Sequence, residues 1–338
     1  MTTLQDVAQR AGVSIATVSK VLSNTPYVSK ETRRKVLQAI AELDYVPNLA
    51  ARALSSGKTR IITVVFPIVY DPIFSDPLTM SILEGIELEC RARGYNILLS
   101  TPRLTARGAD AHYRQLIRSG YMDGVIAIDN VPMGSVLEPV QRKGIPGVAI
   151  GYHPAAHFVR SDDRQGGQLL MEHIIGLGHR RIGLVSVPED LNFSIPQRLE
   201  GMRAAAEAAG LDFGALPVQK GDFSVEGGAQ AAAEVLGAHP NLTALIVLND
   251  RMAMGAIQQA RALGYAVPGR LSVVGYDDIP AAATFAPPLT TVCQQAPELG
   301  RAAARMLFAL LDKQTPEPVS LPTHLVIRQS SAVPYHAC

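Results

Sequence analysis

Apolar positions near the amino terminus recur at helical spacing and predict a short first helix. Leu4, Val7, Ala8 and Ala11 fall on one face, because steps of three and four residues return to the same side of a helix. Gly12 can adopt the positive φ that ends such a helix. A tight turn is therefore expected at this glycine.

Two further helices are expected to begin at serines. Ser14 is a good N-cap for the second helix, and Ser29 for a third helix over residues 30–43. Two short helices joined by a glycine turn are typical of a helix-turn-helix, in which the start of the second helix meets base edges in the major groove of DNA. The expected buried positions are Val18, Val21 and Leu22 in the second helix and Val36, Leu37, Ile40 and Leu43 in the third.

After Gly57 the pattern changes to apolar strand-like runs that alternate with helical stretches. This alternation predicts an α/β fold with parallel sheets covered by helices on both faces. The predicted strands are residues 61–66, 96–100, 124–128, 146–150, 181–187, 244–248 and 272–276. The predicted helices between them include residues 81–93, 166–177, 197–209, 225–236 and 252–263.

Charge is distributed unevenly along the chain. Residues 1–60 contain nine Lys/Arg and four Asp/Glu, a net charge of +5, whereas the whole chain carries +1 and the remainder therefore −4. A basic head on a mildly acidic body is typical of nucleic-acid binding. The alternative is a small helical bundle that contacts another protein, but the helix spacing, the glycine turn and the charge asymmetry together favour DNA.

The composition indicates a cytoplasmic protein of two or three domains. The chain has 338 residues with ample apolar content for large cores. Its first residues lack the apolar stretch of a signal peptide, and no window approaches the roughly 20 apolar residues of a membrane helix. Cys90, Cys293 and Cys338 are far apart and lack metal-ligand spacing, so reduced thiols are expected.

No catalytic motif stands out in the sequence. It contains no Gly-x-Gly-x-x-Gly loop after Phe66 and no Gly-x-Ser-x-Gly elbow, and its eight histidines form no Cys/His cluster. A Ser, His and Asp constellation assembled from distant positions stays open at this point. The expectation is a binding protein without enzyme activity, cofactor or metal.

Eight segments carry a family resemblance and are spread along most of the chain. They are Leu4-Gln-Asp-Val-Ala, Ala11-Gly-Val-Ser-Ile-Ala-Thr-Val-Ser-Lys-Val-Leu, Tyr45-Val-Pro-Asn-Leu-Ala-Ala-Arg-Ala-Leu, Gly178-His-Arg-Arg-Ile-Gly, Arg198-Leu-Glu-Gly-Met, Asn249-Asp-Arg-Met-Ala-Met-Gly-Ala, Val273-Val-Gly-Tyr-Asp-Asp and Pro288-Leu-Thr-Thr-Val. In combination these segments strongly resemble the lactose-repressor (LacI/GalR) family of bacterial transcription regulators.

The resemblance implies an organisation into three parts. An all-α helix-turn-helix DNA-binding domain is expected in residues 1–46, a hinge helix and linker in 47–60, and an effector-binding and dimerisation domain in 61–338. The last is expected to be a periplasmic-binding-protein-like core of two doubly wound parallel-sheet subdomains, about 61–161 with 293–321 and about 162–290 with 322–338. Crossing strands near Ser161, Thr290 and Leu321 are expected to join them.

The implied mode of DNA binding uses both grooves. Ile15 and Ala16 open the recognition helix in the major groove, and Leu54 is placed to wedge between base steps in the minor groove. Leu54 could instead be a core residue, and Arg52 a solvated linker charge. A homodimer is expected, since one helix-turn-helix makes few base contacts and family operators are near-palindromic. The expected DNA-contacting residues are Ser14, Ile15, Ala16, Thr17, Ser19, Lys20, Asn24, Thr32, Tyr45, Asn48, Ala51, Arg52 and Leu54.

Polar residues follow several predicted strands, where the ligand crevice of an open α/β sheet lies. Carboxylates, amides and an arginine beside an aromatic ring suit a sugar, because planar polar groups bind paired hydroxyls while the ring covers the apolar face. In the family, positions matching Arg198, Asn249 and Asp277 are common effector contacts, and the one matching Phe223 is a stacking aromatic. The expected effector-binding residues are Asp71, Phe74, Asp76, Asp129, Arg198, Phe223, Asn249, Asp277 and Gln294.

The main effector candidates also have structural alternatives. Asn249 and Asp277 could cap helices, which is the commonest role of Asn or Asp after a strand. Phe223 could be a core residue. A cation at a helix start, such as Arg198, needs an anionic partner, so a ligand or a carboxylate is expected beside it.

One position departs from the family pattern. Many sugar-responsive relatives carry Asp at the position matching Gly151, so a sugar contact here has either moved to Tyr152 or His153 or been lost. The resemblance implies a repressor of a carbohydrate-utilisation operon that leaves a palindromic operator when a small sugar-like effector closes the cleft. A corepressed regulator that responds to a nucleobase or another metabolite stays open, as does a sugar-binding protein with no DNA role.

Overall fold

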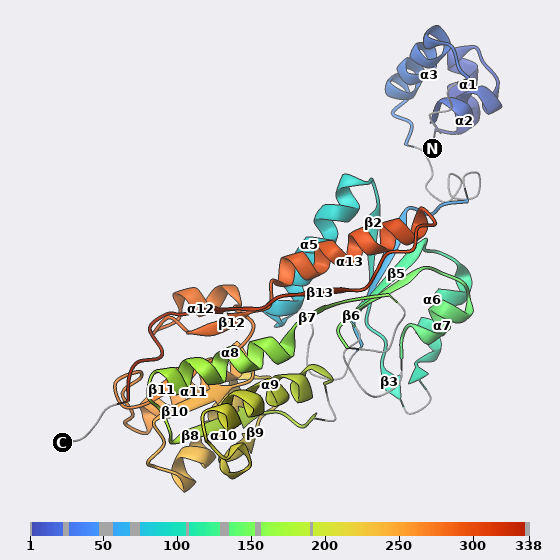
Figure 1. The fold of residues 1–338 in the computed structure, drawn as a ribbon. Coiled ribbons are helices and arrows are strands. Elements are labelled where there is room, and N and C mark those ends of the chain that lie inside the picture. Colours follow the sequence, from blue (N-terminus) through green and yellow to red (C-terminus); the bar gives the residue numbers. More distant parts are fainter. Residues whose placement is uncertain are drawn as a thin grey trace. The chain divides into compact units, whose positions relative to one another are not determined.

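The computed structural model describes residues 2–22, 27–46, 57–67, 75–105, 108–128, 135–152, 157–189 and 192–334. The chain divides into two compact units, residues 1–60 with 121–123 and residues 61–120 with 124–338. The first is a helical head and the second an α/β body (Figure 1). No helix within the described ranges is long and apolar enough to cross a membrane.

Local sequence signals set the ends of the helices in the head. Gly12 follows the first helix in the left-handed conformation, with φ 66°. Ser14 and Ser29 each cap the helix that follows by accepting a hydrogen bond from the backbone N–H three residues later, at 3.2 Å in both cases. The expected helix-turn-helix and both serine caps are confirmed. The helices are α1 (Leu4–Ala11), α2 (Ile15–Leu22) and α3 (Lys30–Glu42).

One apolar stripe from each helix forms the core of the head. The prediction that Leu37 faces inward is wrong, because 52% of this residue is exposed. Successive residues of a helix point about 100° apart, so a helix that buries Val36 turns Leu37 to the side and continues its stripe at Ala39. The fully buried residues of this core are Val7, Ala8, Val18, Val21, Val36 and Ala39.

A six-stranded parallel sheet forms the N-terminal subdomain of the body. Its strand order is β13-β7-β6-β5-β1-β2, so the winding direction reverses between β1 and β5. Helices α5 and α13 lie side by side and cover this sheet, with α13 in contact with β5, β6 and β7 (Figure 1). The elements are β1 (Ile61–Val65), α5 (Pro77–Ala92), β2 (Asn96–Ser100), a β3–β4 hairpin (Leu104–Thr105 and Gly108–Ala109), α6 (Ala111–Ser119), β5 (Gly124–Ile128), α7 (Glu138–Arg142), β6 (Gly147–Ile150), β7 (Phe158–Ser161), α13 (Ala296–Leu311) and β13 (Val319–Leu321).

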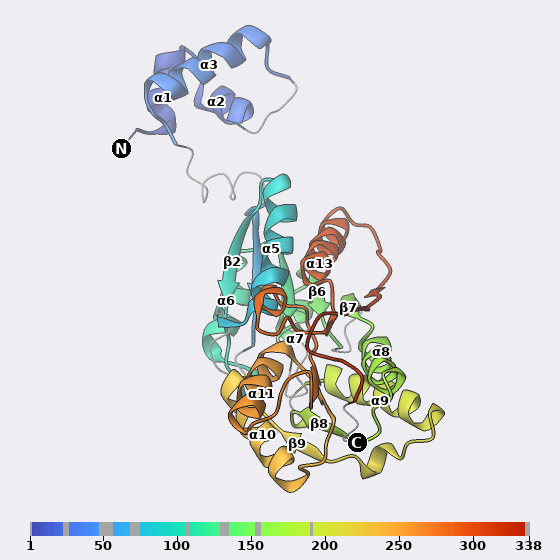
Figure 2. The ribbon, with the colours of Figure 1, turned by 90° about the vertical axis from the view of Figure 1, so that its left-hand side faces the viewer.

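A four-stranded parallel sheet in the order β11-β10-β8-β9 forms the C-terminal subdomain. Helices α8 and α9 lie on one side of β8 and helices α10 and α11 on the other (Figure 2). The expected class, a helical head followed along the chain by two doubly wound subdomains, is confirmed. The elements are α8 (Asp163–Gly176), β8 (Ile182–Ser186), α9 (Ser194–Ala208), a 3-10 turn (Phe213–Ala215), β9 (Val218–Lys220), α10 (Val225–Ala238), β10 (Ala244–Val247), α11 (Asp250–Ala262), β11 (Ser272–Val274) and α12 (Pro280–Thr284).

The chain passes between the two subdomains at three places within the described ranges. Strand β7 ends at Ser161, and α8 of the other subdomain begins at Asp163. Gln294 and Gln295 separate β12 (Thr291–Cys293) from α13, and Thr323 lies between β13 and β14 (His324–Val326). Strands β12 and β14 pair antiparallel, outside both large sheets. The segments that join the subdomains therefore lie together at their boundary.

Three helix pairs pack at unusually short range because glycines face the backbone of the partner helix. A Cβ on Gly201 of α9 would lie 1.8 Å from the carbonyl oxygen of Arg164 in α8, and one on Gly167 of α8 would lie 2.0 Å from that of Arg198 in α9. The same reciprocal arrangement joins the other two pairs. It involves Gly228 and Gly255 in α10 and α11, and Gly85 and Gly300 in α5 and α13.

Adding a methyl group at this contact should destabilise the body. We expect Gly201→Ala to lower the free energy of unfolding by about 1–3 kcal/mol or more, because only a backbone shift can relieve the clash with Arg164. Gly237, near the end of α10, has no atom within 4 Å of its added Cβ. Gly237→Ala is therefore the matched control and should raise stability by up to about 1 kcal/mol through helix propensity. Urea denaturation of both variants measures the effect, and equal stabilities would contradict the close-packing argument.

Candidate functional sites

The start of α2 presents apolar side chains on the surface of the head. Ile15 is 47% exposed, and Ala16 and Lys20 are exposed beside it. Thr17 and Ser19 are half-buried. The exposed side chains at this helix start contribute little to the core of the head, which leaves them open to contact with a partner.

Other predicted DNA-contacting residues have structural roles in the head. The hydroxyls of Ser14 and Thr17 share a hydrogen bond of 2.9 Å, and that of Ser29 donates to the hydroxyl of Thr32 at 2.9 Å. Tyr45 packs, partly buried, against the core of the head. A phosphate contact by any of these groups would come in addition to capping or packing. Asn24, Asn48, Ala51, Arg52 and Leu54 lie outside the described residues.

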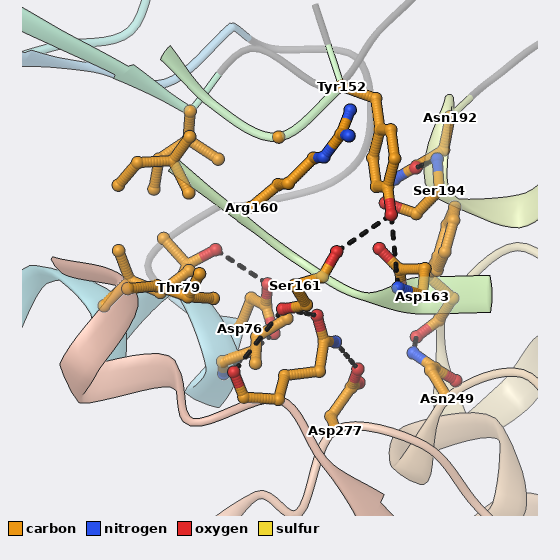
Figure 3. A pocket seen from close by; sticks show the side chains of 18 of the residues that line it. Asp76, Thr79, Tyr152, Arg160, Ser161, Asp163, Asn192, Ser194, Asn249 and Asp277 are labelled. Atoms are coloured by element: carbon orange, nitrogen blue, oxygen red, sulfur yellow. Dashed lines mark hydrogen bonds between the residues drawn. The ribbon is translucent and has the colours of Figure 1, made fainter. Parts of the chain in front are cut away.

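A cavity of about 220 Å³ opens between the two subdomains of the body (Figure 3). Its walls come from the ends of strands in both sheets and from the crossing segments at Ser161 and Gln294. This is the crevice beyond the carboxyl ends of the strands that a doubly wound fold provides. The predicted effector residues that line it are Asp76, Arg198, Phe223, Asn249, Asp277 and Gln294. The predicted residues Asp71, Phe74 and Asp129, together with His153, lie outside the described part of the chain.

Arg198 of α9 is held in this pocket by groups from three other segments of the chain. Its Nε donates to Oδ1 of Asp163 at 2.7 Å, and its Nη1 donates to the carbonyl oxygen of Leu248 at 2.6 Å. The guanidinium carbon lies 3.7 Å from the ring centroid of Tyr276. Burial alone would lower the pKa of Arg198, but the Asp163 carboxylate raises it above its ordinary value. The anionic partner expected from the sequence is therefore present within the protein.

Two buried carboxyl groups follow β10 and β11. Asp277 accepts a hydrogen bond from Nε2 of Gln294 at 2.6 Å. Asp250 accepts from the hydroxyl of Thr291 at 2.5 Å and from the N–H of Ile279 at 3.0 Å. Burial, followed for Asp277 by its proximity to Asp250, raises the pKa of both carboxyls, to about 7 for Asp250. Asp277 caps no helix here; it is held by Gln294 and lies 4.0 Å from Nη1 of Arg198.

Other pocket residues cap helices and line the cavity at the same time. Asn249 caps α11 by accepting from the N–H of Met252 at 2.9 Å, and its Nδ2 donates to the carbonyl oxygen of Phe223 at 3.2 Å. Asp76 caps α5 through the N–H of Leu78 at 3.2 Å. Phe223 has φ 70° and is half-buried at the edge of the core. Capping is thus a definite role of Asn249 and Asp76, and both still face the cavity.

Several lining residues were not among the predicted effector contacts, although Tyr152 was one alternative for the sugar contact missing at Gly151. Asp163, the partner of Arg198, is the first residue of α8, and Tyr152 donates from its hydroxyl to the carbonyl oxygen of Ser161 at 2.8 Å and accepts from the N–H of Asp163 at 3.1 Å. Arg160 lies beside the Tyr152 ring (Figure 3). The requirement of Arg198 for an anion was the one sequence signal that pointed to Asp163. Within the described residues, no group of three or more His, Cys, Asp or Glu is arranged to hold a metal ion.

Comparison with known proteins gives the same picture along the whole chain. Residues 3–48 match the family of bacterial regulatory proteins described as the lacI family, and residues 171–331 match a periplasmic binding protein-like domain. The chain is 34% identical over 337 residues to the HTH-type transcriptional regulator CelR of Thermobifida fusca, which covers 97% of this chain and 98% of the relative.

Solved structures resemble both the head and the body. A Lac repressor dimer bound to operator and the anti-inducer ONPF aligns with a TM-score of 0.85 and 28% identity, over 98% of this chain and 99% of the other. A complex of the transcriptional regulator CelR with cellobiose aligns with a TM-score of 0.72 and 31% identity, over 98% and 100% of the two chains. The likeness extends from the helix-turn-helix through both subdomains.

The buried carboxyl of Asp250 should make stability depend on pH. The folded state holds this proton up to about pH 7, whereas the unfolded chain releases it near its ordinary pKa of 3.8. Its contribution to the free energy of unfolding is therefore present below about pH 4 and is lost as the pH rises towards 7, by up to about 1.4 kcal/mol per pH unit. We expect Asp250→Asn to remove this decline.

Urea denaturation between pH 4 and pH 8 tests the direction in which the free energy of unfolding changes with pH. The stability of Asp250→Asn relative to the original protein should rise across the interval and level off above about pH 7. Asp312→Asn removes an exposed carboxylate after α13 and serves as the control. A relative stability that falls with rising pH would show that Asp250 is stabilising in its ionised form.

Proposed function

The chain belongs to the lacI family of bacterial regulatory proteins, and we propose that it represses a carbohydrate-utilisation operon under the control of a small sugar-like effector. The helix-turn-helix head makes it a DNA-binding transcriptional regulator, and the periplasmic-binding-protein-like body supplies a ligand pocket. The proposal adds three points to this assignment: the class of effector, its action as an inducer, and the residues that bind DNA and effector.

The main support for a sugar-like effector is the combination of polar groups in the pocket. A guanidinium, an amide and a carboxyl group, on Arg198, Gln294 and Asp277, converge on a cavity of about 220 Å³. Phe223 lines the same cavity. Planar polar groups can bind adjacent hydroxyls in pairs while a ring covers an apolar face, as a sugar requires. The cavity volume suits a ligand of monosaccharide size.

Operator recognition is assigned to the start of α2. Ile15 and Ala16 are exposed where a helix-turn-helix meets base edges. They can contact a thymine methyl group but offer no paired hydrogen bonds to a base. Two chains joined through the body would read the two halves of a near-palindromic operator, and Leu54 is assigned to a wedge in the minor groove at its centre.

The position of the pocket provides the link from effector to operator. Its residues come from both subdomains and from the crossing segments at Ser161 and Gln294. A ligand that binds both sets of residues favours one relative orientation of the subdomains over others, by the difference in its affinity for them. Release of the operator follows if that orientation is incompatible with the spacing of two heads on DNA.

The first two residues of α2 should set operator preference. Exchange of Ile15 and Ala16 for Ser and Gln should change the half-site that the protein selects, because polar groups then replace apolar contacts to base edges. Selection from randomised half-sites, followed by sequencing, measures the preference. Leu37→Gln alters another exposed apolar residue of the head and should leave the selected sequence unchanged. Recovery of the same half-site for the exchanged pair would refute the assignment.

Asp277 should be required for the response to effector. We expect Asp277→Ala to weaken sugar affinity by roughly tenfold or more, because a sugar hydroxyl loses its hydrogen-bonding partner in the pocket. Its neighbour Asp278 pairs with Arg328 at 2.6 Å and is not among the lining residues, so Asp278→Ala is the matched control. Calorimetric titration with a panel of sugars, nucleobases and amino acids measures affinity, and a gel-shift assay measures operator release. A nucleobase or amino acid that binds where no sugar does would rule out the carbohydrate assignment.

A further inference from the structure

Three carboxyl groups on the pocket wall already have partners within the protein. Asp163 pairs with Arg198 at 2.7 Å. Asp76 accepts from the N–H of Leu78 at 3.2 Å and from the hydroxyl of Thr79 at 2.8 Å. Asp277 accepts from Gln294, and its burial favours the neutral form by raising its pKa. Each of these carboxyl groups therefore already has a hydrogen-bonding or ionic partner within the protein.

Three arginines line the described part of the pocket wall, and they differ in their acidic neighbours. Arg198 is paired with Asp163. Arg251, at the start of α11, lies near Asp222, whose pKa is lowered by hydrogen bonds from Ser224 and in smaller part by Arg251. The third arginine on the described part of the wall is Arg160 of β7.

Arg160 is held in place by aromatic rings. Its guanidinium carbon lies 4.7 Å from the ring centroid of Tyr152 and 4.8 Å from that of Phe158. Tyr152 is itself fixed by hydrogen bonds to Ser161 and Asp163 on either side of the crossing segment (Figure 3). Within the part of the chain that the structure describes, no carboxylate lies within 4.0 Å of Arg160.

Stacking does not use the N–H groups of Arg160, and these groups make no hydrogen bond to another described side chain. Contact with aromatic rings uses the faces of a guanidinium, whereas hydrogen bonds to an anion use the N–H groups in its plane. A guanidinium presents two parallel N–H groups that match the two oxygens of a carboxylate. Half-burial strengthens such a pair, because water screens the charges less than at the surface. A guanidinium with no carboxylate beside it among the described residues can pair with one carboxylate of a ligand.

We infer that the effector is a sugar acid, a monosaccharide that carries one carboxylate, and that Arg160 is the residue that selects it. The inference rests on the proposed function, since it refines the class of sugar bound in the same pocket. Polar groups of the C-terminal subdomain, such as Arg198, bind the hydroxyls, and Arg160 on the N-terminal subdomain binds the acid group. The ligand then contacts both subdomains.

Titration calorimetry with matched pairs of sugars tests this inference. The probes are D-galacturonate and D-galactose, D-glucuronate and D-glucose, D-gluconate, and D-glucose 6-phosphate. We expect at least one acid to bind roughly tenfold or more tightly than its neutral parent. Arg160→Gln should bring the ratio of the two affinities close to one, and Arg160→Lys, which keeps the charge but loses the paired N–H groups, should give an intermediate ratio.

Arg203 provides a matched control for the loss of a stacked arginine. Arg203 lies on α9 and is not among the residues that line the pocket. Its guanidinium carbon is 5.0 Å from the ring centroid of Phe213. Arg203→Gln should leave the affinity ratio unchanged, and thermal melting should show that all variants are folded.

The remaining outcomes separate this inference from the proposed function. Equal or tighter binding of the neutral parents, or an unchanged ratio in Arg160→Gln, would overturn the sugar-acid inference while the carbohydrate assignment stands. Tighter binding of the sugar phosphate than of any sugar acid would overturn the inference that the acid group of the effector is a carboxylate. Absence of binding by every sugar to the folded protein would overturn both proposals.

Discussion

The buried guanidinium of Arg198 is the interaction on which the pocket depends. Only 6% of this residue is exposed, and a charge removed from water is tolerated only where partners surround it. Those partners are Asp163 at the start of α8, the carbonyl group of Leu248 after β10, and the ring of Tyr276 after β11. Satisfying one cation therefore fixes the relative positions of a helix start and two strand ends.

Close helix packing makes this arrangement possible. Gly167 brings α8 against the backbone of Arg198, and Gly201 brings α9 against the backbone of Arg164, next to Asp163. Larger residues at either position would separate the helices and lengthen the 2.7 Å ion pair between Asp163 and Arg198. Since loss of one partner from a buried pair leaves an uncompensated charge, the packing of these helices and the chemistry of the pocket are one constraint.

The sequence predicted features that depend on short-range signals or on general rules of topology. Helix caps at Ser14 and Ser29 lie a few residues from the groups they bind, and polar residues after parallel strands, such as Asn249 and Asp277, gather at one edge by topology alone. Contacts between distant segments were not predictable in this way. The stacking of Arg160 on Tyr152 depends on how β7 leaves the sheet.

The local sequence pattern gave a wrong prediction, or none, where it was consistent with more than one orientation of a helix. Leu37 fits an apolar stripe in sequence, but the helix buries Val36 and Ala39 instead. Helix α13 was not predicted, although Pro297 in its first turn is a helix-start signal. Because α5 covers one side of this helix and the sheet covers another, its apolar residues do not form a narrow stripe. Helix α5 begins at Pro77, four residues before the predicted start, because Asp76 provides its cap.

Asn249 can cap a helix and contact a ligand at the same time. Its oxygen is committed to α11 and its nitrogen to the carbonyl oxygen of Phe223, so the side chain is rigid before any ligand arrives. Rigid polar groups lose little conformational entropy on binding, which raises the affinity available from each hydrogen bond. The same reasoning applies to Arg160, whose guanidinium is already oriented by two rings. Arg160 and Asn249 belong to different subdomains, so a ligand that contacts both binds most tightly in one relative orientation of the subdomains. The difference between its affinities for this orientation and for the others is the free energy available to move the heads.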